Sequence, residues 1–138
     1  MKVYFDAEGA IVGRLGSYAA KELLKGKEVV IINSEKAIIS GDRTVIVGQI
    51  RNVRKMGEGS SSMKGPKISR SPDRLLKRMI RGMMPRKKAR GREAYKRLRC
   101  YVGLGIGKVK QEDLKLIKKI EYKKPIKSST IKEIAKLL

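Results

Sequence analysis

The side chains of this sequence that are best suited to chemistry are cationic, and they are concentrated in one part of the chain. Residues 51–100, here called the basic block, carry 18 lysines and arginines against 3 acids, out of a net charge of +22 for all 138 residues. Eleven of the 13 arginines lie there. An arginine guanidinium grips a phosphate group through two parallel hydrogen bonds. The block therefore predicts a polyanionic partner, with nucleic acid as the first candidate.

Two stretches of the basic block have the spacing of a binding surface. In residues 72–84 the outer positions of an expected helix, opposite an apolar stripe, are all basic: Arg74, Lys77, Arg78 and Arg81. Such a face repels itself, because no acid alternates with the cations. A membrane-surface helix would carry a Trp or Phe wedge, which this one lacks. Residues 86–99 hold eight cations in fourteen positions, which favours a phosphate-facing role for both stretches.

Aromatic side chains are scarce within and beside the basic block. Only Tyr95 and Tyr101 accompany its cations, and aromatic residues make up 4% of the chain. Proteins that read single strands by stacking display several aromatic rings. The composition therefore favours recognition of the backbone and shape of a folded nucleic acid.

Other kinds of chemistry find little support in the sequence. The chain has no histidine, which removes the commonest general base and the commonest metal ligand. Cys100 is the one cysteine, and we expect it to be a small buried apolar residue in a reducing compartment. Residues 103–108 (GLGIGK) match neither the Walker A loop nor the dinucleotide fingerprint. We therefore predict no catalytic residue, no cofactor and no metal ligand.

The elements that must position the basic block begin with an α/β pattern. Strands are expected at residues 3–6, 28–33 and 37–40, and helices at 12–25 and 42–56. The mostly apolar run at 28–33 suits a strand that is buried on both faces, as in a parallel sheet covered by helices. Alternation of strands and helices is typical of α/β domains.

The second half of the chain is expected to extend the same domain, which we place at residues 1–138. Residues 57–71 are rich in Gly, Ser and Lys and predict a long mobile basic loop before the helix at 72–84. Strands are expected at 98–102 and near 119–122. A terminal helix opens with a capping box, Thr130 followed by Glu133, within a Lys-rich extension at 104–138. That helix is too short to be stable alone, so it must dock.

Three separated stretches resemble one known protein family. Residues 81–103 (RGMMPRKKARGREAYKRLRCYVG) resemble the signature region of the thirteenth large-subunit ribosomal protein family. That family shows an R-G-M-(L/I)-P run, a basic G-x-x-A helix, L-x-V-Y and a glycine. Residues 6–17 (DAEGAIVGRLGS) and 30–41 (VIINSEKAIISG) also look like this family, in the same order, and the length favours its archaeal branch.

The sequence departs from the bacterial pattern of that family at two places. Bacterial members carry a histidine-containing segment before the R-G-M-L-P run, whereas residues 60–70 contain no histidine. Met84 stands where leucine is common, which is a volume-conserving exchange. The missing histidine-containing segment bears on which contacts the loop at 57–71 makes.

The resemblance implies both a fold and a function. The fold is a three-layer α/β/α domain with a central, largely parallel four-stranded sheet. The function is that of a structural constituent of the large ribosomal subunit, which binds large-subunit (23S) rRNA beside neighbouring ribosomal proteins and joins early in assembly. No membrane contact and no self-association are expected, and the location is the cytoplasm.

The resemblance and the charge pattern together define the expected rRNA-binding residues. The family signature carries over nine of them: Arg81, Arg86, Lys87, Lys88, Arg90, Arg92, Lys96, Arg97 and Arg99. Charge alone adds five from the loop and the following helix: Lys64, Lys67, Arg70, Arg74 and Arg78.

Two functions of other classes stay open on the residues alone. A DNA-binding or DNA-compacting protein would use the same cations, although nothing here looks like a helix-turn-helix, a zinc module or a basic zipper. An RNA- or nucleotide-processing enzyme would need a catalytic pair or a phosphate loop, and neither is evident. A preference for duplex DNA over folded rRNA in competition binding would favour the first alternative. Turnover of a nucleotide or RNA would favour the second.

Overall fold

A parallel β-sheet lies at the centre of the domain. The computed structural model describes residues 1–56, 66, 68–105, 117–119 and 127–138. Strand β2 (Glu28–Ile32) pairs in parallel with β1 (Lys2–Asp6) on one side and with β4 (Leu98–Cys100) on the other. The short β5 (Ile117–Lys119) pairs in parallel with the free edge of β1, which gives the order β4-β2-β1-β5. The predicted α/β class with a parallel sheet is confirmed.

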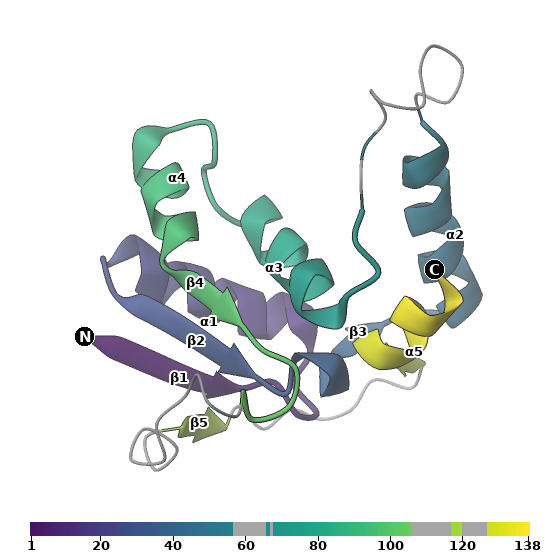
Figure 1. Ribbon diagram of the computed structural model, residues 1–138, viewed down its shortest axis with the longest axis horizontal. Coiled ribbons are helices and arrows are strands. Elements are labelled where there is room, and N and C mark those ends of the chain that lie inside the picture. Colours follow the sequence, from purple (N-terminus) through teal and green to yellow (C-terminus); the bar gives the residue numbers. More distant parts are fainter. Residues whose placement is uncertain (57–65, 67, 106–116, 120–126) are drawn as a thin grey trace.

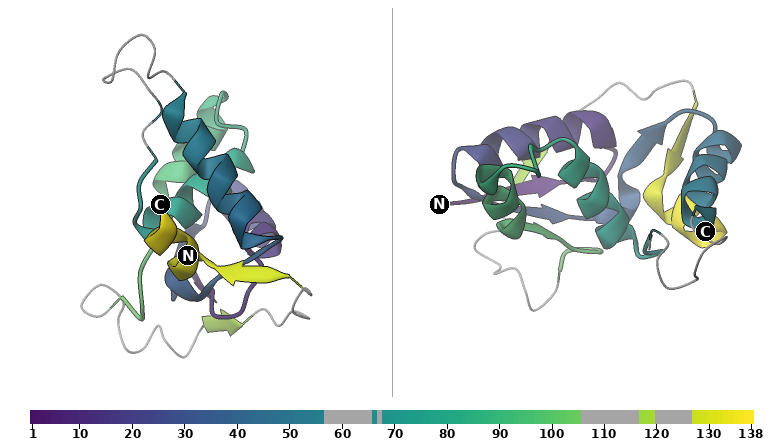
Figure 2. Two further views of the ribbon diagram at one scale, coloured as in Figure 1. Left: turned by 90° about the vertical axis from the view of Figure 1, so that its right-hand side faces the viewer. Right: turned by 90° about the horizontal axis from the view of Figure 1, so that it is seen from above.

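Three helices cover one face of this sheet: α1 (Val12–Leu24), α3 (Pro72–Gly82) and α4 (Ala89–Lys96). Figures 1 and 2 show them on the same side of the strands. Alternate strand residues such as Phe5 and Ile31 point to that side, because successive strand side chains face opposite ways. They join Leu15, Leu76 and other helix residues in the main apolar core.

The opposite face of the sheet has a smaller apolar cluster of its own. Tyr4, Val30 and Ile32 are buried there, and Tyr101 packs against them. Within the described part of the chain, no helix contributes an apolar residue to this cluster. The three-layer arrangement therefore stays a prediction.

A second group of elements packs beside the sheet. Strands β3 (Ile38–Ser40) and β6 (Ser128–Thr130) form an antiparallel pair, next to helices α2 (Arg43–Lys55) and α5 (Ile131–Leu137). The expected capping box is present, since the Thr130 hydroxyl accepts from the Glu133 N–H and the Glu133 carboxylate accepts from the Thr130 N–H. Ile131 and Ile134 are fully buried in the main core. The terminal helix thus docks as predicted.

Two glycines allow close contacts that position the helices of the basic block. At Gly16 on α1, the position of a missing Cβ lies 2.5 Å from the sulfur of Met83, just after α3. Ile80 of α3 lies 3.5 Å from the same position, so Gly16 allows α3 to pack closely on α1. At Gly91 a Cβ would overlap the carbonyl group of Pro85, so the turn between α3 and α4 folds back onto α4.

Several predicted boundaries shift by one to three residues. The helix expected at 72–84 ends at Gly82, and the strand expected at 98–102 ends at Cys100. A short 3-10 helix, η1 (Ser34–Lys36), follows β2 and was not predicted. Most of the expected loop at 57–71 lies outside the described residues, so its mobility is untested.

Candidate nucleic-acid interface

The basic residues of the α3–β4 segment (residues 72–100) mostly point outward. Ser71 precedes α3 as expected, but its hydroxyl contacts the Asp73 carboxylate and caps no backbone N–H. Of the predicted rRNA-binding residues, nine are exposed: Arg70, Arg74, Arg86, Lys87, Lys88, Arg90, Arg92, Lys96 and Arg99. Three more are half-buried: Arg78, Arg81 and Arg97. Lys64 and Lys67 lie outside the described residues.

The stretch at 68–105, which contains this segment, cannot neutralise its own charge. It has 13 lysines and arginines but only two acids, Asp73 and Glu93. Even if both acids were paired one to one, eleven cations would remain without an acidic partner in that stretch. Cations held together by a folded backbone create a positive potential that attracts a polyanion.

Two of the predicted phosphate-binding arginines hold the protein together. The Arg97 Nη2 donates to the Leu23 carbonyl at 3.2 Å, and the Arg90 Nη2 donates to the Leu24 carbonyl at 3.1 Å. These carbonyls lie in the last turn of α1, at the negative end of the helix dipole, and the Leu23 carbonyl also accepts the Gly26 N–H. The two arginines therefore tie α4 to the end of α1, and their contact with rRNA stays a prediction.

A pocket of about 430 Å³ opens between α3, α4 and β4. Seven residues line it: Asp73, Arg74, Lys77, Tyr95, Arg99, Cys100 and Tyr101. Within it the Lys77 ammonium lies 5.0 Å from the centre of the Tyr95 ring, a cation–π geometry. Burial lowers the pKa of Lys77, because partial removal from water disfavours its charged form.

The expected rRNA-binding residues did not include three residues of this pocket: Lys77, Tyr95 and Tyr101. Lys77 shares the charged face of α3 with Arg74, and this spacing was the available signal. Nothing in the pattern showed that α3 would lie against β4, which brings the two tyrosines to the same pocket.

Cys100 forms the inner wall of the pocket and behaves as expected. Its side chain is buried and forms no disulfide. Burial raises the pKa of the Cys100 thiol to about 12, so it stays neutral at physiological pH and is a poor nucleophile.

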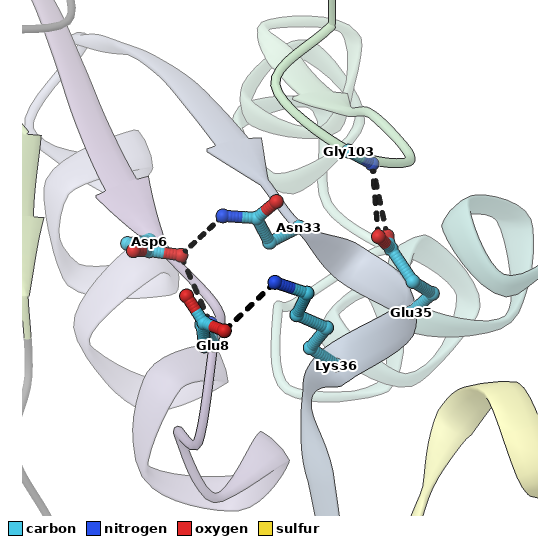
Figure 3. A network of polar contacts seen from close by, with 6 residues as sticks. All are labelled: Asp6, Glu8, Asn33, Glu35, Lys36 and Gly103. Carbon is cyan, nitrogen blue, oxygen red and sulfur yellow. Dashed lines mark hydrogen bonds and ion pairs between the residues drawn. The ribbon is translucent and has the colours of Figure 1, made fainter.

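A polar network fixes the far end of the segment to the carboxyl ends of the strands (Figure 3). The Asn33 side chain donates to the buried Asp6 carboxylate at 2.9 Å. The Glu35 carboxylate accepts the Gly103 N–H at 3.0 and 3.1 Å, and the Gly103 carbonyl accepts the Asn33 N–H at 2.8 Å. Asp6 and Glu35 therefore stabilise the fold through these hydrogen bonds.

The comparison with known proteins decides the family. Residues 1–105 match the family described as Ribosomal protein L13, and this stretch contains α3, α4 and β4. The chain belongs to the ribosomal protein L13 family. The resemblance drawn from its three motifs is confirmed.

Three archaeal relatives show how far the similarity to this family extends. "Large ribosomal subunit protein uL13" of Methanocaldococcus jannaschii is 41% identical over 135 residues, which cover 96% of this chain and 94% of its own length. The protein of that name from Methanosarcina barkeri is 51% identical over 100 residues, 72% of this chain and 69% of its own. The one from Pyrobaculum islandicum is 38% identical over 143 residues, 99% of this chain and 74% of its own.

Membership in the L13 family makes the chain a structural ribosomal protein, and it confirms the prediction that the chain is not an enzyme. In the described residues no group of three or more acids and cysteines has the arrangement of a metal site. None of the described helices has the length and apolar character needed to cross a membrane.

Proposed function

We propose that this L13-family chain is a structural constituent of the large ribosomal subunit and binds large-subunit (23S) rRNA through its outward-facing cations. The observation that carries the proposal is the nine exposed predicted residues at 70–99, in a stretch with two acids. Uncompensated cations on a folded frame are suited to the phosphate backbone of folded RNA.

The proposed mechanism is charge neutralisation. RNA helices repel one another, and a rigid set of arginines and lysines between them lowers that repulsion. If about eight phosphates are neutralised, the logarithm of the binding constant should fall with the logarithm of salt concentration at a slope of about −6 to −7. The loop cations Lys64, Lys67 and Arg70 belong to the same proposed contact.

The proposal includes the setting in which the protein acts. We place it on cytoplasmic ribosomes beside neighbouring large-subunit proteins, where it joins early in assembly and does not self-associate. The bonds of Arg90 and Arg97 to α1 are consistent with this setting, since they hold α4 in place through contacts within the protein itself. We also propose the three-layer arrangement of the fold.

Sucrose-gradient sedimentation at low salt tests the proposal. The endogenous protein should travel with the large subunit, and crosslinks to large-subunit rRNA should map to residues 70–99. A protein that stays at the top of the gradient contradicts the proposal. Preference for duplex DNA over folded rRNA in competition binding would favour the DNA-binding alternative.

A further inference from the structure

Tyr95 on α4 and Tyr101, just after β4, line the same pocket. The chain has five tyrosines and one phenylalanine. Tyr4 and Phe5 are buried in the sheet, and Tyr18 is exposed on α1. Tyr95 and Tyr101 both line the pocket between α3, α4 and β4. Two of the five aromatic rings within the described residues therefore lie at one point of the basic surface.

Cations surround these rings. Arg74 and Arg99 are exposed at the pocket, and the Lys77 ammonium lies over Tyr95. β4 is an edge strand, so side chains from both of its faces, Arg99 and Cys100, reach the pocket. The Asp73 carboxylate adds an acceptor to the same lining.

We propose that this pocket receives one unpaired nucleotide of the bound RNA, with its base against the tyrosine rings and its phosphate on Arg74 and Arg99. The inference rests on the proposed rRNA binding and adds a point of contact to it. Unpaired bases are recognised by stacking on aromatic rings and on guanidinium planes, and by hydrogen bonds to their edges. Asp73 can accept a hydrogen bond from an exocyclic amino group.

The size and the lining of the pocket favour a nucleotide over a bare phosphate contact. A volume of about 430 Å³ falls in the range of small-ligand pockets, about 300–1,000 Å³. A phosphate contact needs only donors, whereas this lining adds two rings and a neutral thiol wall. Paired bases in an RNA helix are stacked on one another and cannot enter.

Substitution of the ring tests the inference through affinity and its salt dependence. In the full chain, Tyr95→Leu keeps apolar volume but removes stacking, and should weaken binding to large-subunit rRNA about tenfold. The salt slope should be unchanged, because no ionic contact is lost. Arg99→Gln should reduce the slope by about one. Tyr18→Leu, an exposed tyrosine outside the pocket, is the matched control and should bind like the wild type.

Ultraviolet crosslinking of the wild-type complex provides a second readout that does not depend on a variant. Mass spectrometry should find Tyr95 or Tyr101 joined to a nucleotide that is unpaired in the rRNA. If the complex forms, but neither tyrosine is joined to a base and Tyr95→Leu binds normally, the pocket inference is overturned and rRNA binding stands. If no complex forms with large-subunit rRNA, the proposed function fails and the pocket inference fails with it.

Discussion

Charged side chains are used in opposite ways in the first fifty residues and in the α3–β4 segment. Residues 1–50 have seven cations and six acids. Glu22 pairs with Lys25 and Lys27, and Glu8 pairs with Lys36. In the stretch at 68–105 two acids face 13 cations. The first region nearly balances its charge, whereas the second has eleven more cations than acids.

The second region itself contains two kinds of cation. Arg90 and Arg97 donate to carbonyl groups at the end of α1, while side chains such as Arg86 and Arg92 are exposed. The same residue type therefore stabilises the fold at one position and is available for RNA at another. A count of positive charge along the sequence does not distinguish cations bonded within the fold from cations that are exposed.

The largest expected effect comes from breaking the turn that carries the second region. Gly91→Ala places a Cβ against the Pro85 carbonyl, where backbone must move, and should lower the free energy of unfolding by about 3 kcal/mol. Gly48→Ala, within α2 and with open space around it, should raise it by up to about 1 kcal/mol. Urea unfolding followed by circular dichroism measures both. Equal stability of the two variants would show that the turn is not held at Gly91.

A smaller effect separates the two kinds of arginine. Arg97→Ala removes the hydrogen bond to Leu23 and should cost about 1 kcal/mol of stability. Arg92→Ala, at an exposed position, should change stability by less than about 0.5 kcal/mol and should reduce the salt slope of rRNA binding by about one. Urea unfolding and filter binding give the two quantities. The distinction fails if Arg92→Ala is the less stable of the two.

The smallest effect concerns an ion pair of the first region. Hydrogen bonds from Lys27 and Lys25 hold the pKa of the half-buried Glu22 at about 2, against an ordinary value of 4.5. A lowered pKa stabilises the fold above the ordinary value, and this contribution is lost as the pH falls toward 2. The stability difference between wild type and Glu22→Gln should therefore shrink between pH 4.5 and pH 2. A difference independent of pH would contradict the pairing.

Local elements could be predicted well from the sequence, because their signals are local. The apolar run at β2, the apolar stripe of α3 and the Thr130–Glu133 capping box each depend on residues close together in the chain. The family motifs likewise needed only short stretches, and all three lie within residues 1–105, which match the family.

Contacts between distant elements could not be predicted in this way. The bond between Arg97 and Leu23 joins residues 74 positions apart, and it exists because α3 and α4 pack where they do against α1. That packing depends in part on the missing side chain at Gly16, beside Met83. The convergence of Tyr95 and Tyr101 on one pocket follows from the same packing, so a count of aromatics underestimated their joint use.

The salt dependence of rRNA binding tests most directly whether the exposed cations are the ones that bind. Wild-type protein should bind large-subunit rRNA with a slope of about −6 to −7. The triple variant R86Q/K87Q/K88Q, at three exposed positions between α3 and α4, should fold normally and lose about two to three units of slope. A slope equal to that of the wild type would contradict the account.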